Sequence, residues 1–85
     1  MVDWDSYGWV KRSDQRQRII RFLDGPKTPT DIAEEIGVQL SQISYSLSQF
    51  REKQLVEVLN EDATQGRLYK LTEEGREIKE ELDSQ

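Results

Sequence analysis

The stretch "QLSQISYSLSQFREKQLVEV", residues 39–58, constrains the fold of this chain more than any other part of the sequence. Its first apolar residues repeat at intervals of three and four, which is the spacing of one buried helical face. They are Leu40, Ile43, Leu47 and Phe50. The pattern then changes to the alternation of a strand in "QLVEVLN". We therefore predict a helix over residues 40–53 that leads directly into a strand over residues 55–60.

The outward face of this predicted helix is polar but uncharged, although charged residues make up 34% of the chain. Its members are Ser41, Gln42, Tyr45, Ser48 and Gln49. A glutamine amide can pair with an adenine edge, and a serine hydroxyl can bond a base or a phosphate oxygen. Such a face is therefore suited to a DNA groove. The same composition also fits an ordinary solvated surface, and both interpretations stay open at this point.

Start and stop signals define three more helices. Ser13 can cap a helix over residues 13–24, which "DGP" ends. Thr28, Pro29 and Asp31 are typical of the N-cap, first and third positions of a helix over residues 29–36. Thr72 can cap a last helix over residues 73–82.

The connection "EDATQG" joins the strand at 55–60 to a second alternating stretch at 67–72, so the two strands form a hairpin. Three helices, a hairpin and a closing helix, in that order, predict an α+β, mainly helical winged helix-turn-helix. We expect residues 1–85 to form one such domain, in which residues 1–12 are an aromatic N-terminal extension.

The composition excludes several classes of site. The chain of 85 residues contains no Cys and no His, so disulfides, thiolate or imidazole metal sites and Ser-His or Cys-His nucleophiles are all absent. We therefore expect no enzyme, no metal and no cofactor. No apolar run is long enough for a signal peptide or a membrane span, which predicts a cytoplasmic protein with no membrane contact.

The charge of the chain opposes DNA binding on average. The formal net charge is -5, and the cations that displace counterions from DNA are outnumbered. The distribution is uneven, however, because residues 1–30 hold six basic and four acidic residues, whereas residues 61–85 hold eight acidic and four basic ones. A local patch, rather than the sum, sets the field at a docking surface.

The order of elements and the motifs together resemble a known family. "TPTDIAEEIGVQLSQISYSLSQFREKQLVEVLN" followed by "GRLYKLTEEGREI" resembles the DNA-binding core of MarR/ArsR-type regulators, and most of all small archaeal winged-helix regulators. The similarity covers roughly residues 15–80 and departs from the pattern at two places. Tyr45 and Ser46 stand where Arg or His is frequent, and Gln54 stands where Gly is frequent before Leu55.

The resemblance implies a transcription regulator that binds double-stranded DNA. Helix 40–53 would enter the major groove, and the wing at 60–67 would lie along the backbone or minor groove. The DNA-binding residues expected on this basis are Ser41, Gln42, Ser44, Tyr45, Ser46, Gln49 and Arg67. Arg67 could also be an ordinary wing charge paired with Glu61 or Asp62. An alternative function is a winged-helix protein–protein interaction module within a larger assembly.

The aromatic entry "WDSYGWVK" also has two interpretations. It can fold back over the small core, because Trp buries a large area. It can also form a dimer contact, since regulators of the resembling families bind paired half-sites as dimers. We expect a homodimer on the second interpretation, through Trp4, Tyr7 and Trp9 together with Ile78 and Leu82 of the last helix.

Overall fold

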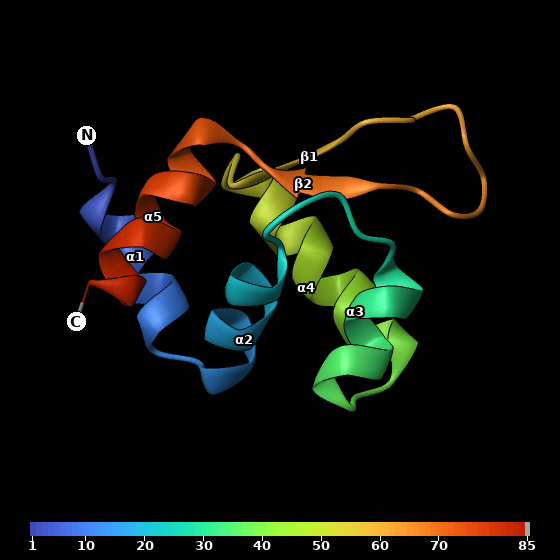
Figure 1. Cartoon of the computed structure of the whole chain (residues 1–85), viewed down its shortest axis with the longest axis horizontal. Coiled ribbons are helices and arrows are strands. Elements are labelled where there is room, and N and C mark those ends of the chain that lie inside the picture. Colours follow the sequence, from blue (N-terminus) through green and yellow to red (C-terminus); the bar gives the residue numbers. More distant parts are fainter. Residues whose placement is uncertain (85) are drawn as a thin grey trace.

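Five helices and a two-stranded antiparallel hairpin follow one another along residues 1–84, the part of the chain that the computed structural model describes (Figure 1). The winged-helix α+β fold expected from the sequence is confirmed, and the boundaries of the predicted elements agree to within two residues. In chain order the elements are α1 (Trp4–Lys11), α2 (Asp14–Phe22), α3 (Pro29–Ile36), α4 (Leu40–Glu52), β1 (Val56–Val58), β2 (Tyr69–Leu71) and α5 (Glu73–Asp83).

Helix α1 lies in residues 1–12, which were expected to form an aromatic N-terminal extension and for which no helix was predicted. Asp3 caps it, because its carboxylate accepts hydrogen bonds from the backbone N–H groups of Asp5 and Ser6. The hydroxyl of Ser6 also donates to this carboxylate at 2.9 Å, which lowers the pKa of Asp3. Tyr7 and Val10 are buried in the core. The segment therefore folds back over the core, which was the first of its two interpretations.

One hydrophobic cluster contains residues from every helix and both strands. Helices α3 and α4 pack against each other, and the predicted seam of α4 supplies Ile43, Leu47 and Phe50, each fully buried. Leu40 was expected in the same seam but is 48% exposed, because it occupies the first position of α4, beyond the packed part of the helix.

The hairpin pairs Val56 with Leu71 and Val58 with Tyr69. A third segment joins it, since Lys27 forms two backbone hydrogen bonds with Tyr69, of 2.8 and 3.0 Å. The turn before α3 is thereby attached to the base of the wing.

Helix α4 ends in a Schellman motif that also begins the wing. The N–H of Gln54 donates to the carbonyl of Arg51, and the N–H of Leu55 donates to that of Phe50, both at 2.9 Å. Gln54 adopts the left-handed conformation, with φ 62°, that glycine usually provides at this position. The departure from the family pattern at Gln54 therefore lies at a site that requires positive φ.

Helix α5 begins directly against this turn. The hydroxyl of Thr72 donates to the carbonyl of Gln54 at 2.6 Å, and the N–H of Thr72 donates to that of Leu55 at 3.0 Å. One turn later, Gly75 lies so close that an added Cβ would be 2.2 Å from the Leu55 carbonyl oxygen. Only glycine leaves room for this approach.

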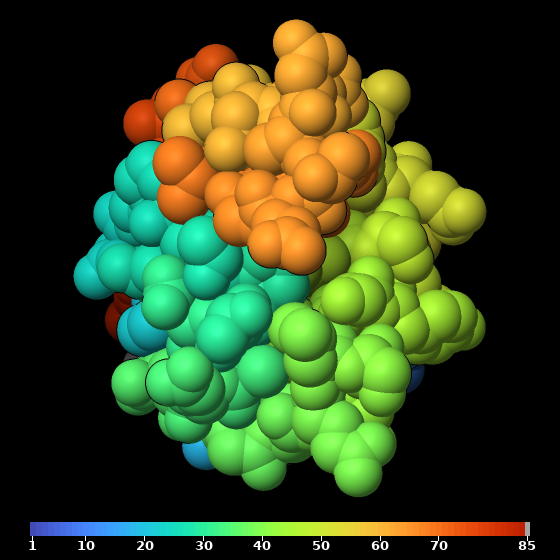
Figure 2. Space-filling view, turned by 90° about the vertical axis from the view of Figure 1, so that its right-hand side faces the viewer, coloured from blue at the N-terminus to red at the C-terminus, as the bar shows by residue number. Residues whose placement is uncertain are grey.

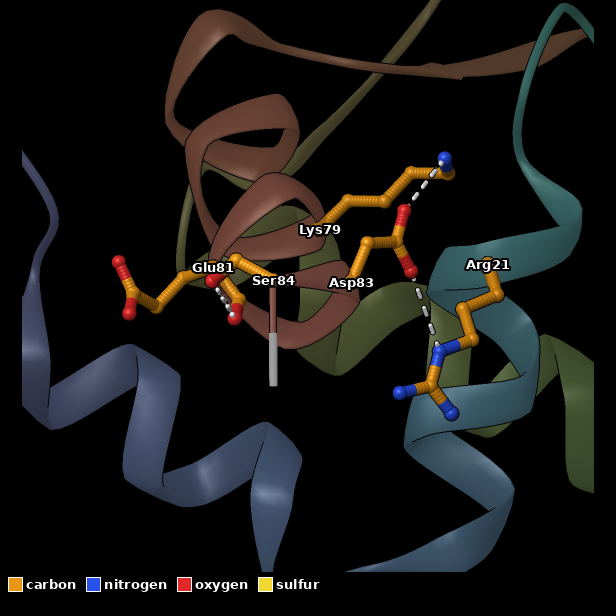
Figure 3. A network of polar contacts seen from close by, with 5 residues as sticks. All are labelled: Arg21, Lys79, Glu81, Asp83 and Ser84. Atoms are coloured by element: carbon orange, nitrogen blue, oxygen red, sulfur yellow. Dashed lines mark hydrogen bonds and ion pairs between the residues drawn. The ribbon is translucent and has the colours of Figure 1, made fainter.

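The far end of α5 is attached to α2 by a charged contact (Figure 3). Asp83 accepts from Lys79 on its own helix at 3.2 Å and pairs with Arg21 of α2 at 3.5 Å. The side chains of Arg21 and Asp83 are 45% and 48% exposed, so this pair adds little stability. Helix α5 also packs against α1, at the end of the molecule opposite the wing loop (Figure 1).

We predict that Gly75→Ala destabilises the fold by about 1 to 3 kcal/mol, because its methyl group collides with a backbone carbonyl that cannot rotate away. Gly25→Ala is the matched control, since nothing lies within 4 Å of a Cβ at Gly25. Urea unfolding followed by circular dichroism measures both. Equal midpoints for the two variants would contradict the close contact.

The opposite result is expected at the end of α4. Gln54→Gly should stabilise the protein by up to about 1 kcal/mol, because glycine adopts positive φ without the steric penalty that other residues have. Gln54→Ala keeps that penalty and serves as the control. A lower thermal midpoint in the glycine variant would show that the Gln54 side chain stabilises the protein by more than its positive φ destabilises it.

Candidate nucleic-acid interface

The exposed surface of α4 consists of two parallel rows of side chains. Residues three and four positions apart lie on the same side of a helix. One row carries amide and phenol groups, from Gln42, Tyr45 and Gln49. The other carries hydroxyl groups and ends on a cation, in the order Ser41, Ser44, Ser48 and Arg51. Figure 2 shows the molecular face on which the wing loop (orange) lies above α3 (teal) and the first turns of α4 (green).

Tyr45 is the centre of the first row. Its side chain is 66% exposed, and its hydroxyl accepts a hydrogen bond of 3.3 Å from Nε2 of Gln49. The Gln49 amide keeps one N–H and its carbonyl oxygen free of this bond, which are the two groups that pair with an adenine edge. Ser48 is used differently, because its hydroxyl donates to the Tyr45 carbonyl at 2.7 Å.

Ser46 does not belong to this surface. It is 6% exposed and lies on the buried side of α4, beside Leu47. Helical geometry explains the burial, since Ser46 is three residues after Ile43 and four before Phe50, and residues at these spacings lie on the same side of a helix. The structure therefore does not place Ser46 on the exposed surface that was expected to contact DNA. The other five expected residues of α4 are exposed or half-buried: Ser41, Gln42, Ser44, Tyr45 and Gln49.

The wing loop is closed by its own side chains. The side-chain oxygen Oδ1 of Asn60 accepts a hydrogen bond from the backbone N–H of Leu68 at 2.7 Å. The side-chain nitrogen Nδ2 of Asn60 donates to the backbone carbonyl of Gly66 at 3.2 Å. Arg67 turns inward, where Nε donates to the Ala63 carbonyl at 3.0 Å and Nη2 to the Glu61 carbonyl at 3.4 Å. Arg67 is therefore bound to loop carbonyls rather than to the carboxylates of Glu61 or Asp62.

The carboxylate of Glu61 pairs instead with Arg51, at the end of the hydroxyl row of α4. The sequence analysis did not name Arg51 among the expected DNA-binding residues, although position 51 lies three residues after Ser48, within the helix predicted over residues 40–53. This ion pair shows that the hydroxyl row is the side of α4 that faces the wing.

Most of the surface that was expected to form a dimer is buried in the monomer. Tyr7, Ile78 and Leu82 are at most 8% exposed and belong to the core. Trp9 packs edge-on against Phe50, with ring centroids 5.2 Å apart. Tyr7, Ile78 and Leu82 are therefore not available for a contact between two copies of this fold, because a short chain needs its large apolar side chains for its own core.

The indole ring of Trp9 makes cation–π contacts with two basic side chains. The guanidinium of Arg16 lies 4.1 Å from the centre of the indole ring and donates to the Trp9 carbonyl, and the ammonium of Lys53 lies 4.9 Å from the ring. Trp4, by contrast, is 60% exposed. Part of the basic excess of residues 1–30 thus stabilises the junction of α1, α2 and α4.

Residues 1–84 contain neither a clustered metal site nor a membrane-spanning helix. No group of three or more His, Cys, Asp or Glu side chains in this range is placed to hold a metal ion. None of the helices described here has the length and apolar character needed to cross a membrane.

We predict that Asn60→Ala loosens the wing loop without unfolding the domain. The substitution removes the bonds of Asn60 to Leu68 and Gly66, and each partly exposed bond contributes about 0.5 to 1.5 kcal/mol. Amide hydrogen exchange at Leu68 should accelerate, while exchange at Leu47 in the core stays slow. Uniform acceleration at both positions would mean that the loop and the core open together.

No family model matches the sequence, and no curated protein is significantly similar to it. Solved structures do match. ZitR of Lactococcus lactis, in complex with DNA, is 20% identical with a TM-score of 0.73 over 85% of this chain and 54% of its own. FabT of Streptococcus pneumoniae, in complex with DNA, is 24% identical with a TM-score of 0.75 over 85% of this chain and 52% of its own.

NadR, in complex with 4-hydroxyphenylacetate, is 26% identical with a TM-score of 0.76 over 94% of this chain and 62% of its own. Another ZitR structure is described as a zinc-responsive MarR family member. The chain spans between about half and two thirds of the length of these proteins. In its order of helices, its hairpin and its overall superposition, the chain has the winged-helix fold of MarR-like regulators.

Proposed function

We propose that this protein is a DNA-binding transcription regulator that places α4 in the major groove and the wing, residues 60–67, along the backbone or minor groove. The observation that carries the proposal is the outward surface of α4. It presents amide, phenol and hydroxyl groups without a single charge from Ser41 to Gln49, in a chain of which 34% is charged.

The structural neighbours support this assignment. ZitR and FabT have the same fold, and both have been solved in complex with DNA. The contacts proposed here are assigned on chemical grounds to Ser41, Gln42, Ser44, Tyr45 and Gln49. Amides and hydroxyls read base edges, whereas they add little non-specific attraction to phosphates. A surface of this kind suits a protein whose binding depends on sequence more than on charge.

We further propose that residues 1–85 act as one domain that pairs into a homodimer in the cytoplasm. One module covers about one major-groove half-site, and two modules about 34 Å apart would read two half-sites on the same side of the duplex. Because Tyr7, Ile78 and Leu82 are buried, Trp4 is the residue of the expected dimer surface that remains exposed for the contact. Sedimentation equilibrium, with and without DNA, tests the pairing. A monomer under both conditions would refute it.

A protein-interaction module remains the second candidate, and one observation favours it. Asp31, Glu34 and Glu35 are all exposed on α3, beside the proposed DNA surface, where they repel phosphates. A basic protein partner would meet this surface favourably. We assign no enzymatic activity to either candidate function.

The deciding experiment is selection from a pool of genomic DNA fragments by the purified protein at several salt concentrations. Selective retention of a few fragments that persists as salt rises supports a sequence-reading regulator, because non-specific binding weakens steeply with salt. Failure to retain any fragment at low salt would reject DNA binding and leave the interaction module.

On a selected fragment, we predict that Tyr45→Ala and Gln49→Ala each cost about 1 to 3 kcal/mol of binding free energy, and much less on a random duplex. Leu47→Ala is the contrasting variant. It should lower the free energy of unfolding by about 2 to 5 kcal/mol, because Leu47 is fully buried. Fluorescence anisotropy and thermal unfolding measure the two effects. Equal losses on both DNAs would reject base reading by α4.

A further inference from the structure

Glu61 lies where the wing meets the end of α4, and it contacts two arginines at once. Its carboxylate pairs with Arg51, and its backbone carbonyl accepts from Nη2 of Arg67 at 3.4 Å. Arg51 continues the hydroxyl row of α4, one turn beyond Ser48. The arginine near the end of α4 and the arginine of the wing loop are thus both bound to the same wing residue in the free protein.

The chemistry of the Arg51–Glu61 pair resembles that of a phosphate contact. The planar guanidinium presents its N–H groups in a fork that fits carboxylate and phosphate oxygens in the same way. The side chains of Arg51 and Glu61 are 43% and 60% exposed, so the pair is solvated and held weakly. A DNA phosphate that approaches between the wing and α4 would therefore compete directly with the carboxylate for Arg51.

We infer that Glu61 occupies, in the free protein, the place of a DNA phosphate on Arg51, and that Arg51 exchanges the carboxylate for a backbone phosphate when DNA binds. The inference rests on the proposed DNA binding and adds Arg51 to its contact residues. The exchange leaves Arg51 charged and satisfied in both states. Glu61 therefore lowers the affinity for DNA, because its ion pair with Arg51 must be broken before Arg51 contacts a phosphate.

The test compares two variants that remove the same charge from adjacent exposed positions, Glu61→Gln and Asp62→Asn. The side chain of Asp62 takes part in none of the ion pairs found among residues 1–84. Both variants should bind a short random-sequence duplex more tightly, because each reduces repulsion from phosphates. The increase in affinity should be about 2- to 5-fold larger for Glu61→Gln than for Asp62→Asn, because the free energy of an exposed ion pair corresponds to a factor of that size.

The same two variants in an Arg51→Gln background complete the cycle. Without Arg51, the additional gain of Glu61→Gln should vanish and the two variants should bind equally. Arg51→Gln alone should make the plot of log affinity against log salt concentration shallower by about 1, as expected for one lost phosphate contact. Equal gains for Glu61→Gln and Asp62→Asn with Arg51 present would overturn the exchange.

Nitrogen NMR of the Arg51 side chain gives a readout that does not depend on affinity. In the free protein, the Nε signal should differ between the wild type and Glu61→Gln but not between the wild type and Asp62→Asn. With duplex bound, the three signals should coincide, because Arg51 then contacts a phosphate in each. A persistent difference in the complex would show that Glu61 keeps Arg51, and would overturn the inference.

Failure of the proposed function gives a different result. In that case neither the wild type nor Glu61→Gln binds any duplex at low salt, while the Arg51 signal of the free protein still responds to Glu61→Gln. The ion pair would then be a structural link between α4 and the wing, and the assignment of Arg51 to DNA would be withdrawn together with DNA binding.

Discussion

The close contact between Gly75 and the Leu55 carbonyl is the constraint on which the wing depends. It joins the end of α4, the start of β1 and the first turn of α5 at one point. The Schellman bonds of Gln54 and Leu55 set the direction in which the chain leaves α4, and Thr72 binds the same turn from the other strand. Because both strands are fixed at this end, the hairpin projects past α4 at a defined angle, and the wing and the outward rows of α4 form one surface.

Local signals in the sequence predicted most of the fold. The capping box of Thr28 and Asp31 and the proline at the first position of α3 are both present in the structure. These signals act between residues a few positions apart, so they are visible without tertiary information. Helix α1 was missed because its apolar residues face two environments: Tyr7 and Val10 pack inward, whereas Trp4 is exposed. Such a helix is stabilised by the core it covers rather than by its own pattern.

The candidate site could be predicted only in part, for the same reason. The uncharged face of α4 follows from helical spacing, although Leu40 is exposed at one end of the seam and Ser46 is buried beside it. The contacts of the wing were not visible in the sequence. Whether Arg67 binds a carboxylate or a carbonyl, and whether Glu61 pairs with Arg51, depends on how the hairpin curves back towards α4. The net charge of -5 likewise did not indicate the charge of the candidate site. Some basic side chains are engaged within the fold, as Arg16 and Lys53 are in their cation–π contacts with Trp9.

The pairing of Lys27 with Tyr69 limits how the proposed DNA-binding surface could adapt to a duplex. This single β-bridge attaches the turn leading into α3 to β2 at the base of the hairpin. A rotation of the wing base would therefore carry α3 with it, and α3 is packed along α4. In the proposed complex the domain would therefore meet a groove as one rigid body. Only residues 60–67, beyond the base of the hairpin, would adjust to the width of the groove. A duplex of unsuitable shape would have to bend to fit the protein, since the protein has little freedom to bend to fit the duplex.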